Sequence, residues 1–423
     1  MVRKLMKEKN LLLLMTTSTY RASAYIDASK KLSINLIIGT NQPDILAHLN
    51  PGSSITLDYS KNNQSLEKTI QHVEKFPIQG VLAVDEETLI LGSMVANSLG
   101  LICNSVESVS ATRSKYELRK ILSEEGLRNP EFKLISSEEN PDLISKSISF
   151  PCVMKPTFLS GSRGVIRANN KEEFKDAYFR IKNILDEPEL LIRGKDEGKM
   201  ILVEEYIDGI EVAVEGIIVN REFVPITIFD KPEPMQGPFF EETIYVTPSR
   251  LPQSIQKKIL KETKNASNAI QLSNGPIHAE LRVDCNGNPW IIDIASRTIG
   301  GKCSRAIKFL DGISLENIIL SHIMGEKIPN IMPISSSSGV MMIPIPQSGI
   351  LNGVKGKEEG LQIKGIEEIE ITIPLGEKVV QLPEGNRYLG FIFANSEKSE
   401  NTIKILKEAH EKLKFNIEKP VEK

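Results

Sequence analysis

The pattern of hydrophobic and polar positions divides the first hundred residues into short strands and amphipathic helices. Short apolar runs bounded by polar residues or glycine predict strands at Leu11–Met15, Ile34–Gly39, Gly80–Val84 and Leu101–Cys103. Between these runs, Leu66, Ile70 and Val73 share one helical face, and a second helical pattern, Thr88–Leu99, ends at Gly100. This alternation of strands and helices predicts a small, doubly wound parallel α/β domain. No Gly-x-Gly-x-x-Gly turn follows the first run, so dinucleotide binding is not expected there.

The middle of the chain has a different pattern, in which several strands follow one another. A helix is expected at about Ser110–Glu125, and further helices at Lys171–Leu185 and Ser254–Leu272. The predicted strands are Phe150–Thr157, Gly164–Ala168, Met200–Tyr206, Glu211–Asn220, Glu222–Asp230, Ile277–Asp284 and Pro289–Ala295. The last two should form a hairpin around Asn286-Gly287-Asn288. Consecutive strands with few helices between them indicate an antiparallel α+β region.

The last hundred residues follow a segment with the composition of a linker, Pro329–Ser338. Beyond it the pattern predicts a closing amphipathic helix at about Glu400–Leu413, and strands at Val340–Ile345, Ile366–Pro374 and Tyr388–Ala394.

Composition narrows the class of protein. The formal net charge of the 423 residues is -3 and aromatic residues make up 5%, so neither nucleic-acid nor membrane binding is expected. The four cysteines are far apart, which is typical of buried thiols in a reducing compartment. Arg3, Lys4 and Lys7 precede the first apolar run, but that run is too short for a secretory signal. A cytoplasmic protein is expected.

The first segment that suggests chemistry is a strand that ends in Lys155, followed by a hairpin with the sequence Ser160-Gly161-Ser162-Arg163-Gly164. Such a loop lets backbone N–H groups approach phosphate oxygens, while a nearby ammonium adds positive charge. Taken alone, the same residues also fit a flexible β-turn with a surface lysine. No Gly-Lys-Ser/Thr closes the loop onto a helix, so the Walker pattern is excluded.

The second segment is Val203-Glu204-Glu205-Tyr206-Ile207-Asp208-Gly209, with Glu211 just beyond. A strand that leads into a glycine-containing bend can present a carboxylate, a carbonyl and an N–H group together, which would match an adenine edge. An edge strand with solvated glutamates is the alternative reading.

The third segment is the predicted hairpin, where Glu280 follows His278 on one strand and Asp293 lies on the other. Both carboxylates have apolar neighbours, so both are expected to point away from the core into a cleft. Two carboxylates that meet need a compensating cation, and Mg²⁺ prefers oxygen ligands. Arg297 and Gly300-Gly301-Lys302 add positive charge and close backbone approach. A pair of exposed carboxylates on a wet sheet face is the alternative.

The order of these segments resembles the ATP-grasp superfamily, from the N-terminal α/β region to about Gly325. The closer likeness is to its L-amino acid ligase branch. It is carried by Phe239-Phe240-Glu241-Glu242 with Pro248, by Gly275–Glu280, and by Asp293-Ile-Ala-Ser-Arg297-x-x-Gly-Gly. The resemblance implies an N-terminal doubly wound α/β domain (1–108), a two-lobed ATP-binding domain (109–328, small mobile lobe about 132–207) and a C-terminal lid domain (329–423).

The resemblance also implies roles for individual residues. Lys115 and Lys155 would hold ATP phosphates under the mobile loop Ser160–Gly164. Glu204, with the backbone of Glu205 and Ile207, would bind adenine, and Glu211 would bind ribose. Glu280 and Asp293 would hold Mg²⁺ (or Mn²⁺), and Arg297 would bind the substrate carboxylate and then the acyl phosphate. The remaining predicted substrate contacts are Glu241 or Glu242 for an ammonium group, His278 for orientation or proton transfer, and the Gly300-Gly301 turn.

The expected reaction is therefore ATP-dependent activation of an amino acid or similar small carboxylate, followed by coupling to an amine. A homodimer is expected from the resemblance alone. Two departures from the superfamily pattern concern the metal: Ala295 replaces a ligating Asn, and Asp293 replaces Glu. The alternatives are a bicarbonate- or formate-activating enzyme of the same fold and a nucleotide-binding module without catalysis.

Overall fold

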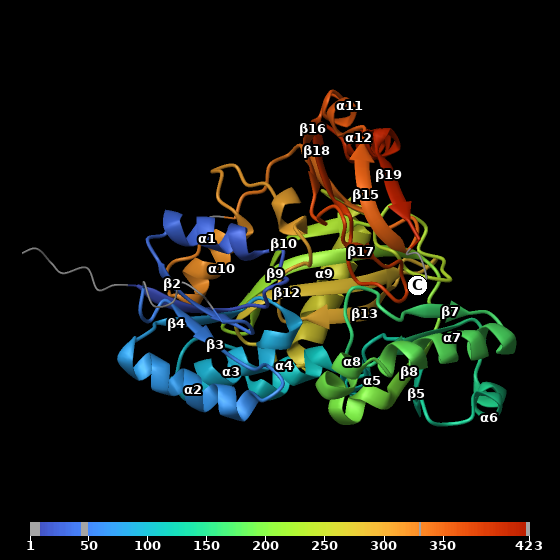
Figure 1. Cartoon of the computed structure of the whole chain (residues 1–423), viewed down its shortest axis with the longest axis horizontal. Coiled ribbons are helices and arrows are strands. Elements are labelled where there is room, and N and C mark those ends of the chain that lie inside the picture. Colours follow the sequence, from blue (N-terminus) through green and yellow to red (C-terminus); the bar gives the residue numbers. More distant parts are fainter. Residues whose placement is uncertain (1–8, 44–49, 330, 420–423) are drawn as a thin grey trace, which may run out of the picture.

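The N-terminal region is a parallel sheet covered by helices on both faces (Figure 1). The structure, a computed structural model, describes residues 9–43, 50–329 and 331–419, so Arg3, Lys4 and Lys7 lie outside the described residues. The strands, in the spatial order β3-β2-β1-β4, are β1 (Asn10–Leu14), β2 (Asn35–Thr40), β3 (Ser54–Thr56) and β4 (Gly80–Ala83). The four leucines of β1 are fully buried because both faces of the sheet are covered.

Two helices cover each face of this sheet. Leu11 and Leu13 share a core with α1 (Ala22–Lys31) and α10 (Leu315–Ile323). Leu12 and Leu14 pack on the other side with α2 (Asn62–Lys75) and α3 (Leu89–Ser98). The expected parallel α/β architecture is confirmed, but Leu101–Cys103 is not a strand. That segment connects α3 to α4 and only packs at the edge of the core.

A second, antiparallel sheet lies within the predicted small lobe. Its strand order is β5-β8-β6-β7. The elements are β5 (Phe132–Ser136), α6 (Pro141–Ile144), β6 (Cys152–Pro156), β7 (Ile166–Ala168), α7 (Lys171–Leu185), α8 (Pro188–Gly194) and β8 (Met200–Glu205). This lobe has a core of its own, in which Phe174 and Ile181 of α7 pack on the sheet.

The largest sheet has eight antiparallel strands and crosses the predicted boundary at residue 328. Its order is β13-β12-β9-β10-β11-β14-β18-β16. Five strands precede the boundary: β9 (Ile210–Val219), β10 (Glu222–Asp230), β11 (Ile244–Thr247), β12 (Gly275–Val283) and β13 (Pro289–Ala295). Three follow it: β14 (Ser337–Ile343), β16 (Ile366–Ile371) and β18 (Gly390–Ser396). The join is made by four register pairs between β11 and β14, from Ile244–Met341 to Thr247–Ser338.

Helices cover this sheet at both ends. They are α4 (Val106–Arg113), α5 (Lys115–Glu124), α9 (Gln253–Ala269) and α12 (Ser399–Lys412). A small third sheet joins β15 (Gly349–Lys355), β17 (Lys378–Val379) and β19 (Lys414–Glu418), with α11 (Lys357–Leu361) nearby. Two expectations are wrong here. The single helix Ser110–Glu125 is two helices, because Ser114 is extended and caps α5. The linker Pro329–Ser338 is too long, because Ser337 already begins β14.

The C-terminal region also contacts the Gly-rich loop of the small lobe. The N–H group of Gly164 donates to the carbonyl of Pro383 over 2.8 Å, and Arg163 Nε donates to the carbonyl of Glu384 over 2.8 Å. The Glu384 carboxylate accepts two hydrogen bonds from Arg180 of α7, of 2.9 and 3.0 Å. The segment after β17 therefore holds both the loop and the helix behind it.

Glu384→Ala should loosen this loop without unfolding the protein. Because Arg180 and Glu384 are each 41% exposed, the loss of their ion pair should change the free energy of unfolding by less than about 1 kcal/mol. Amide exchange at residues 160–164 should accelerate up to about fivefold, measured by hydrogen–deuterium exchange. Glu377→Ala is the matched control, because it removes an equally exposed ion pair, with Arg387, inside the C-terminal region. Equal exchange in the two variants would contradict the proposed contact.

Candidate active site

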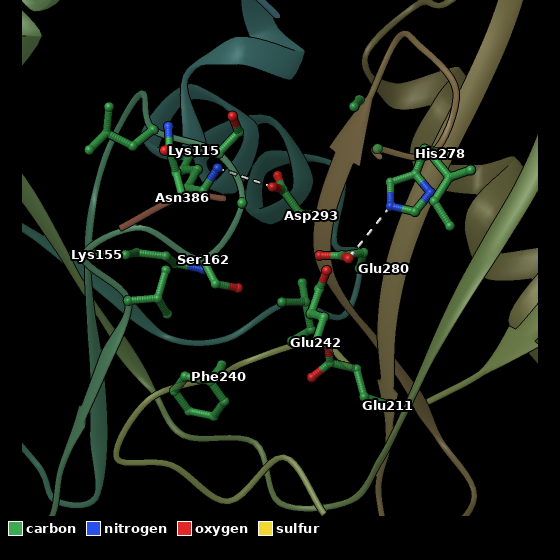
Figure 2. Close-up of a pocket in the computed structure, with 18 of the residues that line it drawn as sticks. Lys115, Lys155, Ser162, Glu211, Phe240, Glu242, His278, Glu280, Asp293 and Asn386 are labelled. Carbon is green, nitrogen blue, oxygen red and sulfur yellow. Dashed lines mark hydrogen bonds and ion pairs between the residues drawn. The ribbon is translucent and has the colours of Figure 1, made fainter. Parts of the chain in front are cut away.

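Residues from all three predicted domains, and from both predicted lobes, line one cavity of about 300 Å³. It lies between the Gly-rich loop, the hinge after β8 and the β12–β13 hairpin (Figure 2). Its lining includes every residue predicted for the site except Arg163, Gly164 and Glu241. The predicted residues in the lining are Lys115, Lys155, Ser160, Gly161, Ser162, Glu204, Glu205, Ile207, Glu211, Glu242, His278, Glu280, Asp293, Arg297, Gly300 and Gly301.

Lys155 is fixed by a buried group of three charges. It lies on β6 beside β8, where Glu204 accepts from Lys155 Nζ over 2.5 Å and from Arg119 Nε over 2.7 Å. Burial lowers the pKa of Lys155 and Arg119 adds to this effect, while Glu204 opposes it. Both carboxylate oxygens of Glu204 are therefore paired with cations. The sequence had predicted that this carboxylate contacts adenine. Arg119, fully buried on α5, was not predicted.

The Gly-rich loop faces the cavity through its first three residues. Gly161 and Ser162 have φ of 65° and 56°, a left-handed turn that aims backbone groups outward. Gly164 is turned the other way, because its N–H group binds Pro383. A Cβ on Gly164 would lie 2.9 Å from Pro156, and its φ is 73°, so both space and conformation require glycine there.

Glu280 and Asp293 lie opposite each other in the register of β12 and β13, as the sequence predicted. A β-bulge follows directly, because Leu281 pairs with Ile291 and Ile292 has no partner on β12. Such a bulge changes the direction of the neighbouring side chains. Arg119 Nη2 donates to the Ile292 carbonyl over 2.5 Å. Lys115, at the start of α5, donates to Asp293 Oδ2 over 3.0 Å (Figure 2).

A lysine that the sequence reading missed neutralises three carboxylates. Lys231 Nζ, at the end of β10, lies 2.8 Å from Glu211, 2.6 Å from Glu242 and 2.7 Å from Glu280. These carboxylates raise the pKa of Lys231 well above its ordinary value despite its burial. Burial, and then Glu280, raise the pKa of Glu242 to about 7. The sequence did hold a signal for Lys231: like Lys155, it is a lysine at the end of a predicted strand.

The carboxylates near the hairpin have the chemistry of a Mg²⁺ site. Oxygen atoms of Glu211, Glu242 and Glu280 lie within 4.8 Å of one another, but the Lys231 ammonium is bonded to all three. The Glu280 and Asp293 pair fits a hard cation better, because Asp293 adds a carboxylate that Lys231 does not engage and whose one cationic partner among the described side chains is Lys115. Ala295, which contributes no ligand, lies across the hairpin from His278.

His278 is held as a cation. Its Nδ1 bonds to Glu215 of β9, and its Nε2 lies 3.5 Å from Glu280. Burial alone would lower the pKa of His278, but Glu215, with Glu280, raises it to about 9. An imidazolium has no lone pair with which to accept a proton. The predicted role in proton acceptance is therefore disfavoured, whereas orientation of the substrate and the alternative expectation, a hydrogen-bonded structural histidine, both fit this geometry.

Arg297 is paired with a residue from the N-terminal domain. Its Nε donates to Glu86 Oε1 over 2.6 Å, and Glu86 lies three residues after the end of β4. Arg21 pairs with the preceding Asp85 over 3.0 Å. These acids were missed, although they stand at the carboxyl end of a predicted parallel strand, where ligands bind in such sheets. Glu241 lies outside the cavity lining, unlike Glu242.

Comparison with known proteins agrees with this geometry. Residues 148–306 match the ATP-grasp domain family, and residues 341–418 match L-amino acid ligase C-terminal domain 2. The chain therefore combines an ATP-grasp domain with an L-amino acid ligase C-terminal domain.

Individual relatives are distant in sequence. The chain is 26% identical over 306 residues to alanine–anticapsin ligase of Bacillus subtilis (strain 168), a match that covers 69% of this chain and 64% of that protein. It is 21% identical over 340 residues to the L-arginine-specific L-amino acid ligase of Bacillus subtilis, covering 79% and 80%. The crystal structure of L-amino acid ligase from Bacillus licheniformis superposes with a TM-score of 0.83 at 24% identity, covering 97% and 99%. This last likeness concerns the fold.

Proposed function

We propose that the protein is an ATP-dependent carboxylate–amine ligase that activates an amino acid or a similar small carboxylate. The observation that carries this proposal is the convergence in one cavity of two lysines, two facing carboxylates and an arginine. These groups suit phosphate oxygens, a divalent cation and a substrate carboxylate, respectively. The names of the relatives, which include amino acid ligases, support the same reaction class.

The residues contribute charge and position rather than a nucleophile. Lys115 and Lys155 bind phosphate oxygens, and Arg297 holds the carboxylate as it becomes an acyl phosphate. Glu280 and Asp293 hold Mg²⁺ or Mn²⁺, which supplies positive charge to the phosphates when bound. With Ala295 in the chain, these two carboxylates are the protein's ligand set.

Amide formation then needs a dry cavity. The amine nitrogen forms a bond to the acyl carbon, the carbon–oxygen bond to phosphate breaks, and phosphate leaves with the electron pair and one nitrogen proton. Water in place of the amine would hydrolyse the intermediate. The contacts of Pro383 and Glu384 with the Gly-rich loop hold that loop over the cavity and so limit the access of water.

Location and assembly are part of the proposal. No helix within the described ranges combines the length and the apolarity that crossing a bilayer requires. We propose a cytoplasmic homodimer that acts on small molecules, and size-exclusion chromatography with light scattering tests the dimer.

The function is tested by phosphate release from Mg-ATP in the presence of single amino acids and pairs. We expect release that depends on an amino acid and that is lost in Lys155→Ala and Asp293→Ala. Release with bicarbonate or formate instead would favour the first alternative enzyme class. ATP binding without release for any acid would favour a nucleotide-binding module without catalysis.

A further inference from the structure

Glu86 is a carboxylate in the active-site cavity that comes from outside the ATP-grasp lobes. It lies in the turn after β4, and one of its oxygens, Oε1, accepts from Arg297. Its side chain is 17% exposed, so it is largely withdrawn from bulk water but still accessible from the cavity. Within the described part of the chain, no hydrogen bond or ion pair engages its second oxygen.

Several other carboxylates around the cavity are more fully satisfied. Glu204 and Glu211 have cations on both oxygens. Asp85 accepts from Arg21, Thr16 and Thr19. Glu86 thus keeps acceptor capacity beside Arg297, the residue proposed to hold the activated acid. A cationic group bound to Glu86 would lie next to that acid.

A second cavity reaches the same turn from the other side. It has a volume of about 1080 Å³ and lies between the carboxyl edge of the N-terminal sheet and α8. Its wall is mostly polar, with Thr16, Asn41, Ser60 and Gln64 among its residues. Glu87 and Asn386 line both cavities, so the two meet at the Glu86-Glu87 turn.

We propose that Glu86 binds the ammonium group of the acceptor amine, with the remainder of the acceptor in the second cavity. The inference rests on the proposed function and adds its second substrate. The chemical class is a primary amine that carries polar substituents, since hydroxyl, amide and charged groups line the second cavity. Glu86 thereby holds the acceptor nitrogen close to the acyl group on Arg297, and the charge-assisted hydrogen bond supplies affinity. The bound ammonium passes one proton to Glu86 before the attack, which frees the nitrogen lone pair, and the second proton leaves with phosphate as the amide forms.

The decisive variant is Glu86→Gln, which keeps the shape and removes the charge. Hydroxylamine, a small uncharged nucleophile used at high concentration, traps acyl phosphates as hydroxamates and does not need an ammonium site. For Glu86→Gln we expect the KM for the acceptor amine to rise about tenfold or more. Hydroxamate formation should stay within about threefold of the unmodified protein, and Glu86→Asp should restore part of the affinity for the amine.

The controls separate this binding role from a role in orienting Arg297. If Glu86 only orients Arg297, hydroxamate and amide formation will fall together, which would overturn the proposal. An unchanged KM for the amine would overturn it as well. Glu326→Gln, which removes an ion pair with Lys9 away from both cavities, should change neither reaction. If the unmodified protein makes no hydroxamate with any acid, the proposed function itself fails.

The second cavity has its own test. Gln64 is exposed on α2, lines this cavity, and has no hydrogen bond or ion pair to other described residues. Gln64→Trp should fill part of the cavity and raise the KM for a large acceptor several-fold more than the KM for glycine. An equal effect on both acceptors would show that the acceptor does not occupy this space.

Discussion

Lys231→Met should lower the free energy of unfolding by about 3–5 kcal/mol, the cost of leaving buried charges without their partner. Lys231 is 3% exposed and is the shared partner of Glu211, Glu242 and Glu280. Removal of its charge leaves these acids to repel one another in a desolvated place. Urea denaturation of the two proteins at neutral pH measures the difference, and Lys231→Arg, which keeps the charge, should lose much less.

The loss of stability in Lys231→Met should also depend on pH. Lys231 and His278 overcome the effect of burial and hold the pKa of Glu280 well below its ordinary value of 4.5. This lowered pKa contributes stability above about pH 4.5, and the contribution is lost as the pH falls through the lowered value. The difference between Lys231→Met and the unmodified protein should therefore shrink below pH 4.5. A loss under about 1 kcal/mol at pH 7 would show that the three acids are neutralised in another way.

Arg297→Ala should reduce kcat for amino acid-dependent ADP formation by about 10²–10³-fold, the usual effect of removing one charge-stabilising donor. The Arg297 side chain is 14% exposed, and Glu86 raises its pKa against the effect of desolvation, so it remains charged at any working pH. Its predicted partner is the acid, whereas the hinge and Lys155 are the predicted nucleotide contacts in the same cavity. The Kd for ATP should therefore change by less than about threefold.

Arg305→Ala is the matched control for that measurement. Arg305 lies in the same connecting segment but pairs with Glu368 and Glu370 of β16, outside the cavity lining. It should keep both kcat and ATP affinity. A loss in Arg297→Ala that came from weakened ATP binding alone would contradict the role assigned to Arg297.

Hydrophobic periodicity predicted most of the fold because most of the elements bury a continuous face. The helix at Lys171–Leu185 and the hairpin around Gly287 are both confirmed. The predicted elements were wrong where the hydrophobic pattern of a segment does not match the way in which that segment packs. Leu101–Cys103 is apolar because it packs at the edge of a core, and Ser114 breaks a helical pattern that continues in sequence. The joining of β11 to β14 could not be predicted, because register between distant strands depends on tertiary packing.

The site was predictable where its residues stand in one segment with a recognisable pattern. Lys155 with its loop, and Glu280 with Asp293, are of this kind. Lys231, Arg119 and Glu86 are single charged residues in unremarkable segments, and only the fold brings them to the cavity. The sequence pattern identified the residues with which these three side chains pair, but the pairs themselves form only in the folded chain.

The pairing of β11 with β14 has a consequence for synthesis of the protein. About 90 residues separate these strands along the chain, from Thr247 to Ser337. At about 5–20 residues per second, a ribosome needs on the order of 5–20 seconds to make them. During that interval β11, which includes the apolar residues Ile244, Tyr245 and Val246, is an open sheet edge. Such edges recruit other chains. We therefore expect the nascent chain to be most prone to aggregation, and most dependent on chaperones, between the emergence of β11 and that of β14.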